Sequence, residues 1–176
     1  MTRRFKPPIF SSAKSGGEPG EREWTLNIDE DEQALVARLL AELRGLLQSD
    51  DDTAAASPLL QRLFPTTYPD DAEKEAEYQR LMREELVASR LHQISAVSKV
   101  LEADDSKLDE GQTIAFMQSI NAVRVVLGTV LDVSEDDEIG ISSDEDGDDD
   151  DEYEGERQLY GYLSWLLEWT VRSLQP

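Results

Sequence analysis

Apolar residues recur three and four positions apart over four long stretches of the chain, and this period predicts four amphipathic helices. The stretches cover residues 30–48, 70–103, 110–131 and 156–174. Three of them begin with an aspartate followed three residues later by a glutamate or glutamine, the pattern of a capping box. These pairs are Asp29 with Glu32, Asp70 with Glu73, and Asp109 with Gln112. A short fifth helix is predicted from Ser57 to Phe64, because Pro58 suits the first helical position.

The stretch 110–131 is apolar on nearly all sides, whereas the other helical stretches carry an apolar stripe. A helix that is apolar all round is buried all round, so we expect residues 110–131 to form the central helix. Gly128 lies inside this stretch, where glycine costs about 1 kcal/mol of helix propensity. We therefore expect another backbone to approach closely at Gly128.

Alternating polarity predicts a strand over residues 23–28, where every second residue from Trp24 to Ile28 is apolar. Residues 3–10 are the predicted partner strand. Two adjacent prolines confine that partner to a sheet edge, because proline donates no backbone hydrogen bond. A hairpin of two strands is marginal alone, so we expect it to lie on the helices.

Charge is distributed unevenly along the chain. Lysine and arginine number 17 and aspartate and glutamate 39, which gives a net charge of −22. Fifteen of the acidic residues, and no basic residue, lie between Asp132 and Glu156. Residues 134–155 offer few large apolar side chains to bury, so they are predicted to form a disordered acidic loop. Residues 11–22, rich in serine and glycine, are predicted as a second, flexible loop.

These features predict a mainly all-α fold, with one helical domain over residues 1–176 that holds about five helices in a bundle-like arrangement. The β hairpin is a small N-terminal appendage of that domain. No apolar run approaches the roughly 20 residues of a membrane span. The N-terminal residues lack the apolar region of a signal peptide, so we expect a cytoplasmic protein that does not enter a membrane.

Residue types that carry catalysis or bind metals are scarce. The chain has no cysteine, and this absence excludes disulfides, cysteine zinc sites and a thiol nucleophile. It has one histidine, His92. No phosphate loop, dinucleotide fingerprint or catalytic triad can be built. An EF-hand alignment with Gly147 at position six places Ser142 at position one and Tyr153 at position twelve, where acidic ligands are required. We therefore predict no enzymatic activity, cofactor or metal, and the negative charge disfavours nucleic-acid binding.

Three residues are candidates for contact with a partner or ligand: Asn121, Arg124 and Trp165. An arginine embedded in an apolar helix needs a partner, because an unpaired buried charge is costly. One interpretation pairs Arg124 with an acidic residue on a neighbouring helix. The other places Asn121 and Arg124 in a polar pocket for a small ligand or for a partner's carboxylate. Trp165 is ambiguous too, because tryptophan occurs both in interfaces and in cores.

Several motifs follow one another along nearly the whole chain. They are Trp24-Thr-Leu-Asn-Ile-Asp29, Arg62-Leu-Phe-Pro65, Tyr68-Pro-Asp-Asp71, Glu77-Tyr-Gln-Arg-Leu81, Ile120-Asn-Ala-Val-Arg-Val-Val-Leu-Gly128 and Leu159-Tyr-Gly-Tyr-Leu-Ser-Trp-Leu166. This set resembles an actinobacterial family, domain of unknown function number two thousand and seventeen. The resemblance implies no established activity and defines no catalytic residue. It implies a gene that often lies beside that of the ClpS adaptor of the Clp protease, and some relatives are labelled transcriptional regulators.

Three hypotheses follow. The first is a non-enzymatic cytoplasmic protein that acts through protein–protein interaction, linked to ClpS/Clp-dependent proteolysis. The second is a transcriptional regulator, which would need a basic recognition helix that the sequence does not show. The third is a small-ligand binder or enzyme centred on Asn121 and Arg124. The sequence leaves a homodimer open.

Overall fold

The computed structural model describes residues 7–13, 22–49, 58–103, 106–131 and 153–175. Within these ranges the chain forms five helices and one small antiparallel sheet, which confirms the predicted, mainly α-helical fold. The helices are α1 (Glu30–Gln48), α3 (Pro58–Gln61), α4 (Ala72–Leu101), α5 (Glu110–Val130) and α6 (Glu154–Leu174). The strands are β1 (Ile9–Ala13), β2 (Arg22–Leu26) and β3 (Lys107–Leu108).

Both predicted loops fall largely outside the described residues. Of the predicted flexible loop 11–22, residues 11–13 and 22 belong to β1 and β2, so the strands reach further into it than expected. Of the predicted acidic loop 134–155, the described part starts at Tyr153, and α6 begins one residue later. The remaining residues of both loops are not described, so the predictions for them stay predictions.

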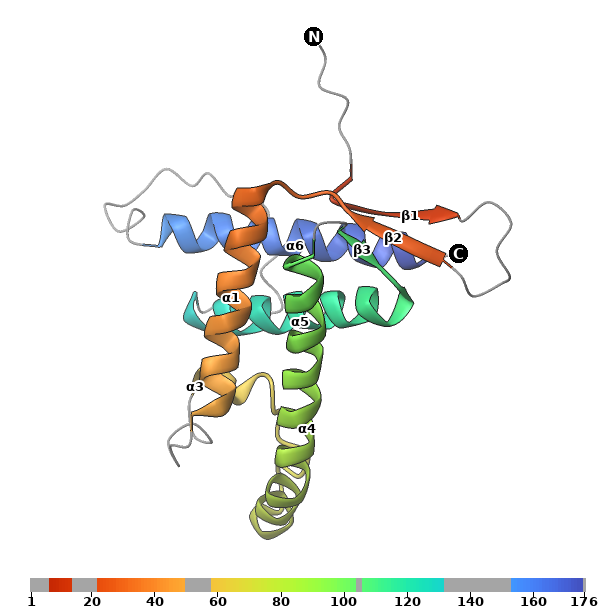
Figure 1. Cartoon of the computed structure of the whole chain (residues 1–176). Coiled ribbons are helices and arrows are strands. Elements are labelled where there is room, and N and C mark those ends of the chain that lie inside the picture. Colours follow the sequence, from red (N-terminus) through yellow and green to blue (C-terminus); the bar gives the residue numbers. More distant parts are fainter. Residues whose placement is uncertain (1–6, 14–21, 50–57, 104–105, 132–152, 176) are drawn as a thin grey trace.

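Four long helices form two crossed pairs (Figure 1). The helices α1 and α4 lie side by side, and α5 and α6 lie side by side across them. The central element is α5, which contacts α1, α3, α4, α6, β2 and β3. Its side chains Phe116 and Ile120 are fully buried. The prediction that residues 110–131 form the central helix is therefore confirmed.

By length and composition alone, α5 is also long and apolar enough to cross a membrane. The sequence-based prediction did not anticipate this, because it found no apolar run of that length. These properties are weak evidence of a membrane span, because the core helix of a soluble protein passes the same test. Within the described residues, α5 contacts four helices and two strands, and 44% of its 18-residue apolar window is buried. Two apolar side chains of α5, Ile114 and Val130, nonetheless remain exposed.

Capping side chains determine where α1 and α5 begin. The carboxylates of Asp29 and Asp109 accept hydrogen bonds from the backbone N–H groups of Glu32 and Gln112. The side chains of Glu32 and Gln112 accept in return from the backbone N–H of each cap. Both predicted capping boxes are thus confirmed, and each satisfies N–H groups that the first helical turn leaves unpaired.

The start of α4 differs from the prediction by one residue. Asp71, not Asp70, caps the helix, and its carboxylate accepts from the Lys74 N–H at 3.1 Å. The N–H of Asp71 donates to the Tyr68 carbonyl at 3.2 Å. Asp70 therefore belongs to the turn between Tyr68 and Asp71, and the helix begins one residue later than predicted. The hydrogen bonds from Lys74 hold the pKa of the Asp71 carboxyl below its usual range.

The sheet has the order β1-β2-β3 and packs against α5 and α6. Of the predicted strand over residues 3–10, residues 3–6 lie outside the described residues. In the described part, β1 begins at Ile9, directly after two prolines that cannot donate to a ladder. Ile9 pairs with Leu26 in antiparallel register. The sequence did not reveal β3, because two residues are too few to show an alternating pattern. Trp24 pairs with Leu108 of this third strand.

Candidate functional site

The candidate residues Asn121 and Arg124 lie one helical turn apart on α5. A guanidinium Nη2 of Arg124 donates to Oδ1 of Asn121 at 3.3 Å. The same guanidinium lies over the ring of Tyr160, which projects from α6, with its carbon 5.6 Å from the ring centre. Tyr160 and Asn121 together therefore hold the Arg124 guanidinium in one position.

The first interpretation of Arg124, an ion pair with a neighbouring helix, is wrong for the part of the chain that the structure describes. No ion pair of Arg124 is found there, and its Nε is buried with no hydrogen-bond partner. An aromatic ring takes the place of the expected carboxylate. Stacking on a ring leaves the terminal nitrogens of the guanidinium able to bind an anion.

Gly128 lies one turn beyond Arg124 on α5. A Cβ atom at this position would lie 3.1 Å from Cε2 of Tyr160 and 3.9 Å from an Nη atom of Arg62. The prediction that another backbone approaches Gly128 is therefore wrong: the group that lies close to Gly128 is the ring of Tyr160. The missing side chain at Gly128 lets the Tyr160 ring come close to α5, beside Arg124.

A matched pair of glycine variants tests this contact. Gly161→Ala is expected to raise the free energy of unfolding by about 1 kcal/mol, since its Cβ meets nothing within 4 Å and alanine favours the helix. Gly128→Ala is expected to give no such gain, because its Cβ crowds the Tyr160 ring. Urea unfolding of both variants measures the difference. An equal gain at both positions would show that the ring moves aside freely.

The third candidate, Trp165, does not join this group. It lies five residues after Tyr160, which places it on a different side of α6. Its ring lies 5.9 Å from that of Tyr162, and it packs partly buried against the core. The Tyr162 hydroxyl is buried, and burial, aided by the negative charge of Glu32, raises the pKa of this hydroxyl.

A second arginine cluster lies between α4 and the segment that follows α3. The guanidinium carbons of Arg83 and Arg90 lie 4.7 Å and 5.8 Å from the centre of the Phe64 ring. Arg90 also donates to the Leu63 carbonyl at 3.2 Å, and its burial lowers its pKa. Leu63 and Phe64 lie within one of the family motifs, but Arg83 and Arg90 lie in none of them, and no pattern in the sequence indicates that these residues meet.

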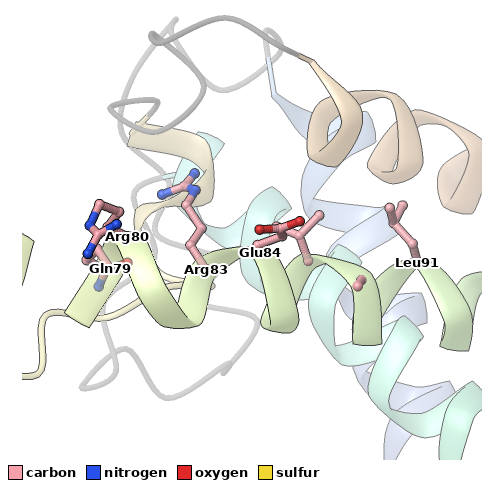
Figure 2. A pocket seen from close by; sticks show the side chains of 7 residues that line it. Gln79, Arg80, Arg83, Glu84 and Leu91 are labelled. Carbon is pink, nitrogen blue, oxygen red and sulfur yellow. The ribbon is translucent and has the colours of Figure 1, made fainter. Parts of the chain in front are cut away.

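Two hollows in the described part of the chain bear on the candidate residues. The larger, about 470 Å³, runs along the middle of α4 (Figure 2). Its lining residues are Gln79, Arg80, Arg83, Glu84, Val87, Ala88 and Leu91. The smaller, about 200 Å³, is lined by apolar residues of α1, α3, α5 and α6 together with Glu42. Neither cavity is lined by Asn121 or Arg124, so neither is the polar pocket of the third hypothesis.

Metal ligands do not gather in the described ranges: no group of three or more His, Asp or Glu side chains there could hold an ion. His92, the single histidine, is exposed on α4. The chemistry that the Arg124 group offers is therefore recognition of an anion by a positioned guanidinium.

Comparison with known proteins identifies the family but no characterised relative. No curated protein and no solved structure matches the chain. A family profile described as "Domain of unknown function (DUF2017)" matches residues 9–174, which span every described helix and strand. The chain therefore belongs to the DUF2017 family.

Proposed function

We propose that this protein is non-enzymatic and acts by binding another protein, with Arg124 as the residue that receives a carboxylate of that partner. The observation that carries the proposal is the guanidinium of Arg124, held by Tyr160 and Asn121 and lacking an acidic partner among the described residues.

Prior positioning makes Arg124 suited to this role. A guanidinium binds a carboxylate through two parallel hydrogen bonds, and the arrangement costs less entropy when the side chain is already held in place. The bond to Asn121 uses one Nη atom, and the Tyr160 ring lies 5.6 Å from the guanidinium carbon. Because Nε is buried and the Arg124 side chain is only half-buried, the Nη groups are the atoms proposed to bind the partner.

The proposed location is the cytoplasm, and the proposed partner belongs to ClpS/Clp-dependent proteolysis. The support for this partner is the gene order that the family resemblance implies, which is association and not mechanism. A role as transcriptional regulator is less favoured, because a net charge of −22 repels the phosphate backbone of DNA. A small-ligand site at Arg124 is less favoured too, since neither described cavity reaches it.

A pull-down from native cytoplasm tests the proposal with three baits: the wild-type chain, Arg124→Ala and Arg38→Ala. Arg38 is the matched control, because it lies on α1 with its side chain 68% exposed and paired only with Glu42 among the described residues. We expect at least one protein to be enriched on the wild-type bait and on Arg38→Ala. The amount of this protein recovered on Arg124→Ala should be about tenfold lower. Purified ClpS adaptor, titrated calorimetrically into each bait, tests the named partner directly.

The variant Arg124→Lys separates charge from geometry. Lysine keeps the positive charge but loses the planar fork and the stack on Tyr160, so we expect it to bind nearly as poorly as alanine. Circular dichroism of each bait checks that the fold is intact. If no protein distinguishes Arg124→Ala from Arg38→Ala, the proposed role of Arg124 is wrong; if ClpS does not bind at micromolar concentration, the Clp link is wrong.

A further inference from the structure

The first two-thirds of α4 are less buried than its last third, although Phe64 and Tyr68 of the preceding segment contact them. All buried residues of this 30-residue helix lie between Ile94 and Leu101, and none of residues 72–93 is buried. Figure 1 shows this part of α4 reaching beyond the other helices. It carries the exposed side chains of Leu81 and Leu86, which are 58% and 36% exposed. Such a helical arm presents a surface to another molecule.

One row of side chains on this arm has an unusual symmetry. Residues at intervals of four form a ridge along a helix, and here the ridge reads Ala76, Arg80, Glu84, Ala88. All four residues are exposed. Read in the opposite direction, the ridge has alanine again at each end and the two charges exchanged. A second copy in antiparallel orientation would therefore place each arginine against a glutamate and each alanine against an alanine.

The two charged residues of the ridge form no ion pair within the described part of the chain. Arg80 and Glu84 have the spacing of an intrahelical pair, yet no nitrogen–oxygen contact within 4.0 Å joins them to each other or to another described residue. In Figure 2 the two side chains diverge along α4. Both belong to the lining of the larger cavity, so both charges border the same hollow on the surface of α4.

We propose that two copies of this protein associate through the α4 arms, antiparallel and related by a twofold axis that passes between the two helices, level with the midpoint of the ridge between Arg80 and Glu84. In this arrangement Arg80 of each copy lies against Glu84 of the other, which gives two equivalent ion pairs. Such equivalence is what a self-complementary interface requires. Alanines at both ends of the ridge let the two helix backbones approach closely. Because a net charge of −22 on each copy opposes association, the matched charges determine where the copies meet.

Charge exchange within the ridge tests the arrangement. Sedimentation velocity at physiological salt, where the Debye length is about 8 Å, would follow the dimer up to about 100 µM protein. We expect R80E and E84R each to raise the dissociation constant of the dimer at least about tenfold, because each sets like charges against each other. An equimolar mixture of the two variants should associate again, since every contact then joins opposite charges. The double variant R80E/E84R should also dimerise.

The matched controls are R38E and E42R on α1. These residues have the same identities and the same spacing of four, both are more than half exposed, and they give the same changes in net charge. We expect both controls to dimerise like the wild type. The proposal is overturned if the wild type stays monomeric and the mixture of R80E with E84R forms no heterodimer, or if R80E dimerises as strongly as R38E. It does not depend on the Arg124 site, so either can fail alone.

Discussion

Replacing Trp24 by alanine is expected to lower the free energy of unfolding by about 4 kcal/mol, as for other fully buried tryptophans. The ring is 1% exposed and lies between the small sheet and the helices. Its Nε1 donates to the carbonyl of Ser173 at 3.1 Å, which joins β2 to the C-terminal turn of α6, 149 residues away in sequence. Alanine would remove both the packing and this link, and urea unfolding followed by circular dichroism measures the loss.

Two further variants separate the packing of the Trp24 ring from its hydrogen bond to Ser173. Trp24→Phe keeps most of the apolar surface but removes the donor to Ser173, so we expect a loss of about 1–2 kcal/mol. Phe10→Ala, on the neighbouring strand with its side chain 37% exposed, should cost less than about 1 kcal/mol. If Trp24→Ala lowers the free energy of unfolding no more than Phe10→Ala does, the sheet is not part of the cooperative unit that the helices form.

The helices could be predicted from the sequence because each combines a sustained apolar period with a capping residue. The starts of α1 and α5 agree with the prediction, since Asp29 and Asp109 have no competing acid before them. The start of α4 was wrong by one residue, because two adjacent aspartates fit the pattern and the turn from Tyr68 decides between them. Local sequence does not show which of the two the turn uses.

The candidate site was only partly predictable. Asn121, Arg124 and Gly128 follow one another three and four residues apart, and this spacing places all three on one face of α5. Nothing in the sequence indicated that Tyr160 would fill that face, because the contact depends on how α5 and α6 cross. Trp165 was named for its residue type, and its contacts with Tyr162 and the core give it a separate place.

Replacing Phe64 by alanine is expected to lower the free energy of unfolding by about 3 kcal/mol. The ring is 6% exposed and lies beside the guanidinium groups of Arg83 and Arg90, so its loss would leave a cavity and remove two cation–π contacts. Phe64→Leu keeps most of the apolar volume and should cost about 1 kcal/mol. Tyr68→Ala, at a ring that is 42% exposed, is the control with a small effect.

A double-mutant cycle isolates the arginine–phenylalanine contact from the packing of the ring. The variants Phe64→Leu, Arg83→Ala and their combination should show a coupling energy of about 1 kcal/mol. The cycle with Arg90 should give a smaller value, because its guanidinium lies further from the ring and keeps its hydrogen bond to the Leu63 carbonyl. Additive losses in both cycles would mean that Phe64 acts only as apolar volume. The two arginines would then fix the α3–α4 junction without help from the ring, and the Arg62-Leu-Phe-Pro65 motif would reflect packing alone.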